Sequence, residues 1–148
     1  MTTETVSLNQ PLYGASFGQA VSRYFKKYAT FSGRASRSEF WWVFLFNAIV
    51  GAVIWILSLT LGVAGGQVDP ATNVLVPGPG FTIVMIIAAL WGLGTIIPYL
   101  AVTWRRFHDT NKSGAFWFLT FIPFVGSIIV LVLLALETNP AGARFDQP

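Results

Sequence analysis

Three long runs of apolar residues dominate the pattern along the chain. They cover residues 40–64, 81–104 and 115–136, and none of them contains a charged side chain. A helix needs about 20 apolar residues to cross the hydrocarbon of a bilayer. Runs of this length are expected to be helical, because backbone groups in lipid must pair within their own segment or its neighbours. The pattern therefore predicts an all-α integral membrane protein, a single domain over residues 1–148 with three transmembrane helices.

The third run differs from the others because Pro123 and Gly126 interrupt it. A proline removes a helical hydrogen bond and kinks or breaks the helix. The run either crosses the membrane with a kink or folds back as a re-entrant hairpin, and only in the second case does the polar tail, residues 137–148, return to the starting side. We favour the kinked crossing, since transmembrane helices tolerate such breaks when neighbours re-pair the backbone.

An amphipathic helix is predicted over residues 16–30, ahead of the first span. Its apolar positions recur with helical spacing: Phe17, Ala20, Val21, Tyr24, Phe25 and Tyr28. Arg23, Lys26 and Lys27 are assigned to the opposite side, and Ser16 with Gln19 forms a capping box at the start. Such a helix is expected to lie in the headgroup region of the membrane, the alternative being a helix that packs on the protein's own loops.

Composition agrees with a membrane protein. Charged residues make up only 10% of the chain and hydrophobic residues 54%, whereas soluble domains carry about 25% charged residues. The absence of cysteine excludes disulfides and thiolate chemistry.

The cationic residues are distributed unevenly and predict the orientation. Five of the nine Lys and Arg residues precede the first run, three lie in the connection 105–114, and none lies in residues 65–80. Because short loops rich in Lys and Arg stay in the cytoplasm, the N-terminus and the connection 105–114 are expected there.

Two polar motifs lie on this predicted cytoplasmic side. In the first, Ser36 and Glu39 form a capping box for the first span, and Arg34 with Arg37 could clamp a phosphate or carboxylate. In the second, Asp109 could neutralise an arginine, and Asp109 or Ser113 could cap the third helix. The sole histidine, His108, is expected to form a hydrogen bond, since a metal site needs three or four ligands.

These motifs predict a polar patch that binds anionic lipid headgroups or the acidic segment of a partner. The candidate residues are Arg34, Arg37, Glu39, Arg105, Arg106, His108 and Asp109. The alternative is that the arginines only anchor the spans.

Catalysis is not expected. The sequence of residues 14–18 satisfies G-x-S-x-G, but the corresponding nucleophile elbow requires a large α/β sheet, so Ser16 is interpreted as a helix cap. The spans lack the ionisable residues that mark transport pathways, and three helices could line a pore only as an oligomer. We predict a non-catalytic binding or scaffold protein with no cofactor, metal or nucleic acid, whose partners are lipids, further copies or other membrane proteins; the alternative is an oligomeric transporter or channel component.

Taken together, the motifs resemble the bacterial membrane family known as domain of unknown function 805. The resemblance rests on F-x-G-R-x-x-R-x-E-F-W-W from Phe31, R-R-x-H-D-x-x-x-S-G from Arg105 and I-P-x-x-G from Ile122. The tail departs from the family pattern at Ala143 and Asp146. The resemblance implies a multi-pass protein of the bacterial inner membrane and no established activity.

Overall fold

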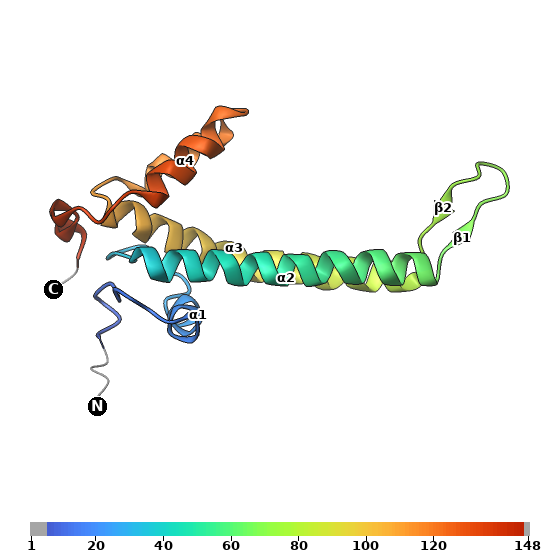
Figure 1. Cartoon of the computed structure of the whole chain (residues 1–148), viewed down its shortest axis with the longest axis horizontal. Helices are drawn as coiled ribbons and strands as arrows, with labels where there is room; N and C mark the ends of the chain where they lie inside the picture. Colours follow the sequence, from blue (N-terminus) through green and yellow to red (C-terminus); the bar gives the residue numbers. More distant parts are fainter. Residues whose placement is uncertain (1–5, 147–148) are drawn as a thin grey trace. The chain divides into compact units, whose positions relative to one another are not determined.

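Helices form nearly all of the regular structure in residues 6–146, which the computed structural model of the chain describes (Figure 1). The prediction of a mostly helical membrane protein is confirmed. Contacts divide the chain into two compact units. We call residues 45–96 the central unit, and residues 6–44 with 97–146 the terminal unit.

The central unit contains most of α2 (Arg37–Ala64) and the first half of α3 (Pro79–Asp109). The rings of Phe46 and Trp91 meet edge to face with their centroids 5.8 Å apart, and the backbone N–H of Gly78 donates to Gly62 O over 3.2 Å. A small antiparallel hairpin of β1 (Gln67–Val68) and β2 (Leu75–Val76) joins the two helices (Figure 1). This hairpin was predicted only as a loop.

The apolar surface of α2 and α3 is exposed. Each helix has an 18-residue window with a mean hydropathy of 2.2, of which only 6% is buried. Trp55 and Leu93, for example, are 64% and 71% exposed. Monomeric soluble proteins rarely expose apolar patches of this extent, whereas a lipid environment accommodates them. Both helices are long and apolar enough to cross a membrane.

The start of α2 agrees with its predicted capping box. The backbone N–H of Glu39 donates to Ser36 Oγ over 3.1 Å, and the N–H of Ser36 donates to Glu39 Oε2 over 2.9 Å. The end of α3 differs from the prediction, because the helix continues to Asp109 through what was expected to be loop. Ser113, rather than Asp109, caps the next helix by accepting from the N–H of Ala115.

The third apolar run does not form one crossing helix, and the favoured prediction of a kinked span is wrong. It divides into a 3₁₀ helix, η1 (Gly114–Phe121), and a short α-helix, α4 (Val125–Ala135), which pack on each other. After α4, the N–H of Asn139 donates to Asp109 O over 2.8 Å. A straight helix of 22 residues would separate its ends by about 33 Å, so the run returns to where it began.

The reversal depends on Phe124, which lies between η1 and α4, and on Gly126 in the first turn of α4. Phe124 has a φ of 66°, a left-handed conformation that no helix interior adopts. At Gly126, an added Cβ would lie only 1.8 Å from Leu119 O. We call η1 and α4 together the helical hairpin. A larger residue at Gly126 would separate η1 from α4.

The predicted amphipathic helix is present as α1 (Phe17–Lys26), shorter than residues 16–30. Its capping box between Ser16 and Gln19 is confirmed. The side that packs on the protein carries Ala20, Arg23, Tyr24 and Lys27. The assignment of Arg23 and Lys27 to the outer side is therefore wrong, because Lys27 lies seven residues, about two turns, after Ala20.

Candidate functional site

The predicted patch residues come together in the terminal unit, but most of them lie inside it. Glu39, Arg105, Arg106, His108 and Asp109 are buried. Outside these, the side chain of Arg34 is 13% exposed and Arg37 is exposed. Most of the expected open surface is therefore an internal polar network.

Glu39 is the acceptor that connects α1, α2 and the N-terminal segment. Its Oε1 lies 2.5 Å from Arg23 Nε, and its Oε2 accepts from the N–H groups of Ser36 and Leu12. The remaining nitrogens of Arg23 donate to backbone oxygens of Val6, Ser7 and Gln10. A carboxylate with this many donors has little capacity left for an outside ligand.

Asp109 forms a second, fully buried centre. It accepts from Arg106, from Tyr13 Oη over 3.0 Å and from Thr138 Oγ1 over 2.7 Å. Burial, followed by the charge of Asp109, raises the pKa of the Tyr13 hydroxyl. Asp109 thereby connects the end of α3 to the N-terminal segment and to the tail.

Arg106 links the same centre to the hairpin. Its Nε donates to Leu134 O over 2.9 Å, and one terminal nitrogen donates to Leu136 O. Leu134 lies in the last turn of α4 and Leu136 directly follows the helix, where a cation is favourable because the last helical carbonyls have no partners within the helix. Arg106 thus caps the C-terminal end of α4.

Arg34 is a bidentate clamp on a carboxylate of the same chain, and Arg37, which the prediction paired with it, is exposed. The Nε and Nη2 of Arg34 lie 2.9 and 2.6 Å from the two carboxylate oxygens of Asp146. Hydrogen bonding to Asp146 raises the pKa of the Arg34 guanidinium. Asp146 is one of the two tail positions that depart from the family pattern, so the resemblance does not supply this ion pair.

His108 and Arg105 hold the loop that precedes α2. His108 Nδ1 lies 2.9 Å from Gly33 O and therefore carries a proton, and the ring stacks on Phe145 at 4.1 Å. The N–H of Ala35 donates to Arg105 O over 3.0 Å. The prediction that His108 forms a hydrogen bond is confirmed. Among residues 6–146, no three His, Asp or Glu side chains gather as a metal site would require.

Sequence reasoning missed Tyr13, Lys27 and Asp146. The spacing of Lys27 from Ala20 was a usable signal, because both positions fall on one side of α1. Tyr13 and Asp146 reach the network only through tertiary folding, 96 and 112 residues from their partners along the chain. No local pattern marks such residues.

Comparison with known proteins agrees with the fold and the motifs. The model of a protein family of unknown function, DUF805, matches residues 28–147. Inner membrane protein YhaI of Escherichia coli K12 is 37% identical over 120 residues, which cover 81% of this chain and 86% of that protein. Inner membrane protein YhaH of the same strain is 35% identical over 123 residues, covering 81% and 87%. No solved structure matches the chain.

The exposed apolar helices and the inner-membrane relatives agree on the location of the protein. It is a membrane protein, and the relatives place it in the bacterial inner membrane. The family match covers both arginine motifs and the helical hairpin of η1 and α4 that follows them. The chain belongs to the DUF805 family of membrane proteins.

Proposed function

We propose that the chain is a non-catalytic binding protein whose terminal unit rests on the anionic cytoplasmic surface of the inner membrane. The observation that carries this proposal is the continuity between α1 and the start of α2. The rings of Phe17 and Trp42 meet edge to face with centroids 5.8 Å apart, and Trp42 Nε1 donates to Ala15 O over 2.9 Å. An aromatic surface on α1 therefore adjoins the entry of a lipid-exposed helix.

The aromatic residues of this surface are exposed, as an interfacial helix requires. Exposure lies between 37% and 42% for each of Phe17, Phe25, Tyr28, Phe31 and Trp42. Aromatic side chains are enriched where a membrane meets water, and an amphipathic helix buries its apolar side about 5–10 Å into that boundary. Lipid is the occupant that best explains an exposed surface of this composition.

Exposed cations supply the preference for anionic headgroups. Arg34, Arg105 and Arg106 are occupied inside the protein, so the proposal assigns this role to Lys26, Arg37 and Arg144, which are exposed. Each cation near an anionic surface contributes about 1 kcal/mol.

The hairpin of η1 and α4 supports the same placement. Its tip residue, Phe124, is 95% exposed, and Phe121 is 70% exposed. The 11 residues of α4 measure about 16 Å, roughly half of the hydrocarbon thickness of about 30 Å. We infer that the hairpin enters the membrane from the cytoplasmic side and returns, which leaves the tail beside Arg34.

Fluorophore labelling tests the placement of α1. The chain has no cysteine of its own, so a dye attaches only at an introduced cysteine. Phe25→Cys and Gln19→Cys, at exposed positions about 120° apart around α1, are labelled with an environment-sensitive dye in lipid nanodiscs. Headgroup spin labels are expected to quench the dye at position 25 strongly and the dye at position 19 weakly. Equal, weak quenching at both positions would reject interfacial binding of α1.

The role of charge is tested separately with Arg37→Gln and the charge-preserving control Arg37→Lys. Enrichment of phosphatidylglycerol over phosphatidylcholine around the protein is measured in mixed nanodiscs. Arg37→Gln is expected to remove about 1 kcal/mol of headgroup attraction, which lowers the enrichment of phosphatidylglycerol at this site about fivefold. If both variants retain the enrichment of the original chain, Arg37 does not contact headgroups.

A further inference from the structure

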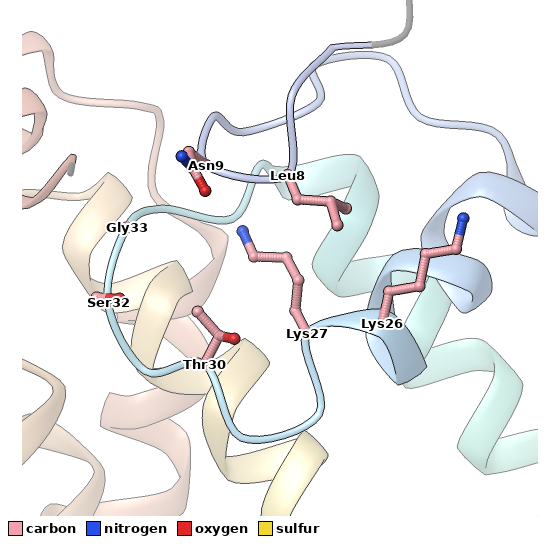
Figure 2. Close-up of a pocket in the computed structure, with 7 residues that line it drawn as sticks. All are labelled: Leu8, Asn9, Lys26, Lys27, Thr30, Ser32 and Gly33. Atoms are coloured by element: carbon pink, nitrogen blue, oxygen red, sulfur yellow. The ribbon is translucent and has the colours of Figure 1, made fainter. Parts of the chain in front are cut away.

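A small pocket in the terminal unit lies between the N-terminal segment, the end of α1 and the loop that follows it (Figure 2). Its volume is about 190 Å³, and its lining consists of Leu8, Asn9, Lys26, Lys27, Thr30, Ser32 and Gly33. A single water needs about 10–15 Å³ on a comparable measure, so a polyatomic ligand fits. Most of the lining residues are exposed, and the pocket therefore opens to solvent.

The Lys27 side chain, in contrast to the exposed lining residues, is buried, with an exposure of only 3%. Its Nζ is buried and has no hydrogen-bond partner among residues 6–146. Figure 2 shows the Lys27 side chain extending between Thr30 and Asn9, with its nitrogen in the space that the lining encloses. Leaving a buried ammonium unpaired is costly, so native proteins normally supply a counter-charge or donate its protons to acceptors.

The neighbouring charges do not satisfy this ammonium. Arg105 and Arg23 face it as cations, while the two carboxylates that act on it, Glu39 and Asp146, already bind Arg23 and Arg34. Burial, and then the charge of Arg105, lowers the pKa of Lys27 to about 8. Near neutral pH the group therefore still carries most of its charge.

The rest of the lining offers donors and no carboxylate. Asn9 contributes an amide and Thr30 and Ser32 contribute hydroxyls, whereas the ammonium of Lys26, which also lines the pocket, extends away from Lys27 (Figure 2). Amides, hydroxyls and ammonium groups surround the oxygens of a phosphate with hydrogen bonds, of which those from ammonium are charge-assisted and strong. A cation or an apolar ligand would leave Lys27 without compensation.

We propose that the Lys27 pocket binds a phosphate group, which either a soluble phosphate compound or the headgroup of a phospholipid supplies. The pocket does not depend on the aromatic surface of α1, so it goes beyond the membrane docking proposed above. Its residues Leu8, Asn9, Lys26 and Lys27 precede residue 28, where the family match begins. The site is therefore inferred for this chain and not for the family.

The test compares the full chain with Lys27→Met, in uncharged detergent near neutral pH. Unfolding is followed through the fluorescence of the 6 Trp residues. The substitution removes an unpaired buried charge and keeps an unbranched side chain, so the variant is expected to fold. Inorganic phosphate at millimolar concentration is expected to raise the melting temperature of the original chain by about 3 °C or more, and that of Lys27→Met by less than a third as much.

Lys112→Gln serves as the matched control, because it removes a lysine outside the pocket. This variant is expected to respond to phosphate as the original chain does. Chloride at equal ionic strength corrects for general screening. An equal response of the original chain and Lys27→Met to phosphate would overturn the assignment of the site to Lys27.

A second arm distinguishes the source of the phosphate. The same variants are placed in phosphatidylcholine nanodiscs with and without phosphatidic acid, whose headgroup is a phosphomonoester. Stabilisation that depends on Lys27 and appears with soluble phosphate identifies a soluble ligand, whereas stabilisation that appears only with phosphatidic acid identifies a lipid. The absence of a Lys27-dependent effect in both arms would reject the site, even if the quenching of α1 supports membrane docking.

Discussion

The terminal unit buries charged side chains, whereas the central unit exposes apolar ones. In the terminal unit, Arg106 and Asp109 have side-chain exposures of 0%, and each is surrounded by partners from the same chain. In the central unit, Leu93 and Trp55 project from long helices with little protein around them. The two units are therefore stabilised differently: outside the helical hairpin of η1 and α4, the terminal unit folds around a polar network, whereas the helices of the central unit depend on lipid to cover them.

The comparison also explains why two arginine motifs need not form a binding surface. Positive flanks orient a membrane protein, but an arginine beside a span can equally hold its own loops together. Here Arg34, Arg106 and Arg23 connect segments that are far apart along the chain. Function at the membrane surface is then assigned to the residues that remain exposed.

The largest expected effect comes from removing the buried carboxylate of the terminal unit. Asp109→Ala leaves Arg106 without its ion pair and Tyr13 and Thr138 without an acceptor, which is expected to lower the free energy of unfolding by about 3–5 kcal/mol. The measurement is thermal or denaturant unfolding in detergent. Asp69→Ala, at a partly exposed carboxylate beside the β-hairpin of the central unit that accepts only local hydrogen bonds from Ala71 and Thr72, is the control, with a much smaller expected loss. Similar losses in both variants would contradict the polar network.

A charge on the central unit tests its lipid-facing surface. Leu93 lies near the middle of α3, and Leu93→Asp is expected to disfavour membrane insertion by about 2.5–3.5 kcal/mol, whereas Leu93→Ala is expected to have a much smaller effect. The measurement is the inserted fraction of the chain after synthesis with membranes. If this side of α3 faced water, the aspartate would have almost no effect on insertion. Normal insertion of Leu93→Asp would therefore show that this side of α3 does not face lipid.

Close packing in the terminal unit is tested at Gly114. An added Cβ there would lie 2.0 Å from the ring of Trp104, so Gly114→Ala forces the ring or η1 to move. A loss of about 1–3 kcal/mol is expected from overpacking. The control is Gly92→Ala in the central unit, where an added Cβ has no neighbour within 4 Å. If Gly92→Ala destabilises the protein as much as Gly114→Ala, then close packing of Gly114 against Trp104 is not the cause of the loss.

The smallest expected effect is the pH dependence of the contribution that Lys27 makes to the free energy of unfolding. Its pKa is about 8 in the folded protein against 10.5 as the ordinary value, so the unfolded chain binds more protons between these values and stability rises with pH across that window. Lys27→Met is expected to be more stable than the original chain near neutral pH by about 1 kcal/mol, a value discounted for solvent in the open pocket. The gain should shrink as pH rises through the window, and unfolding curves at several pH values measure it. A gain that does not change with pH would contradict the buried ammonium.

The sequence predicts those parts of the fold that depend on local or solvent-driven patterns. The apolar runs indicate α2 and α3 because length and hydropathy alone determine whether a helix suits lipid. The two capping boxes locate the starts of α1 and α2, since their hydrogen bonds join residues three positions apart.

The parts that were missed depend on tertiary contacts. Pro123 and Gly126 show that the third run is interrupted, but the direction of the chain after Phe124 depends on packing between η1 and α4. Among the site residues, the partners of Arg34 and Asp109 come from the N-terminal segment and the tail. A pattern within one segment cannot identify such pairs, and it therefore suggested a free cationic surface.

Accessibility mapping tests the central claim most directly, namely that the chain crosses the membrane with α2 and α3 and that the residues after α4 return to the side on which α3 ends. Single cysteines are introduced by Asn73→Cys in the hairpin of the central unit, Lys112→Cys before η1 and Ala141→Cys in the tail, into a chain that has no other cysteine. A membrane-impermeant maleimide is then added to intact spheroplasts and to inverted vesicles. The account predicts labelling of positions 112 and 141 from the cytoplasmic side and of position 73 from the opposite side; labelling of positions 141 and 73 from the same side would contradict it.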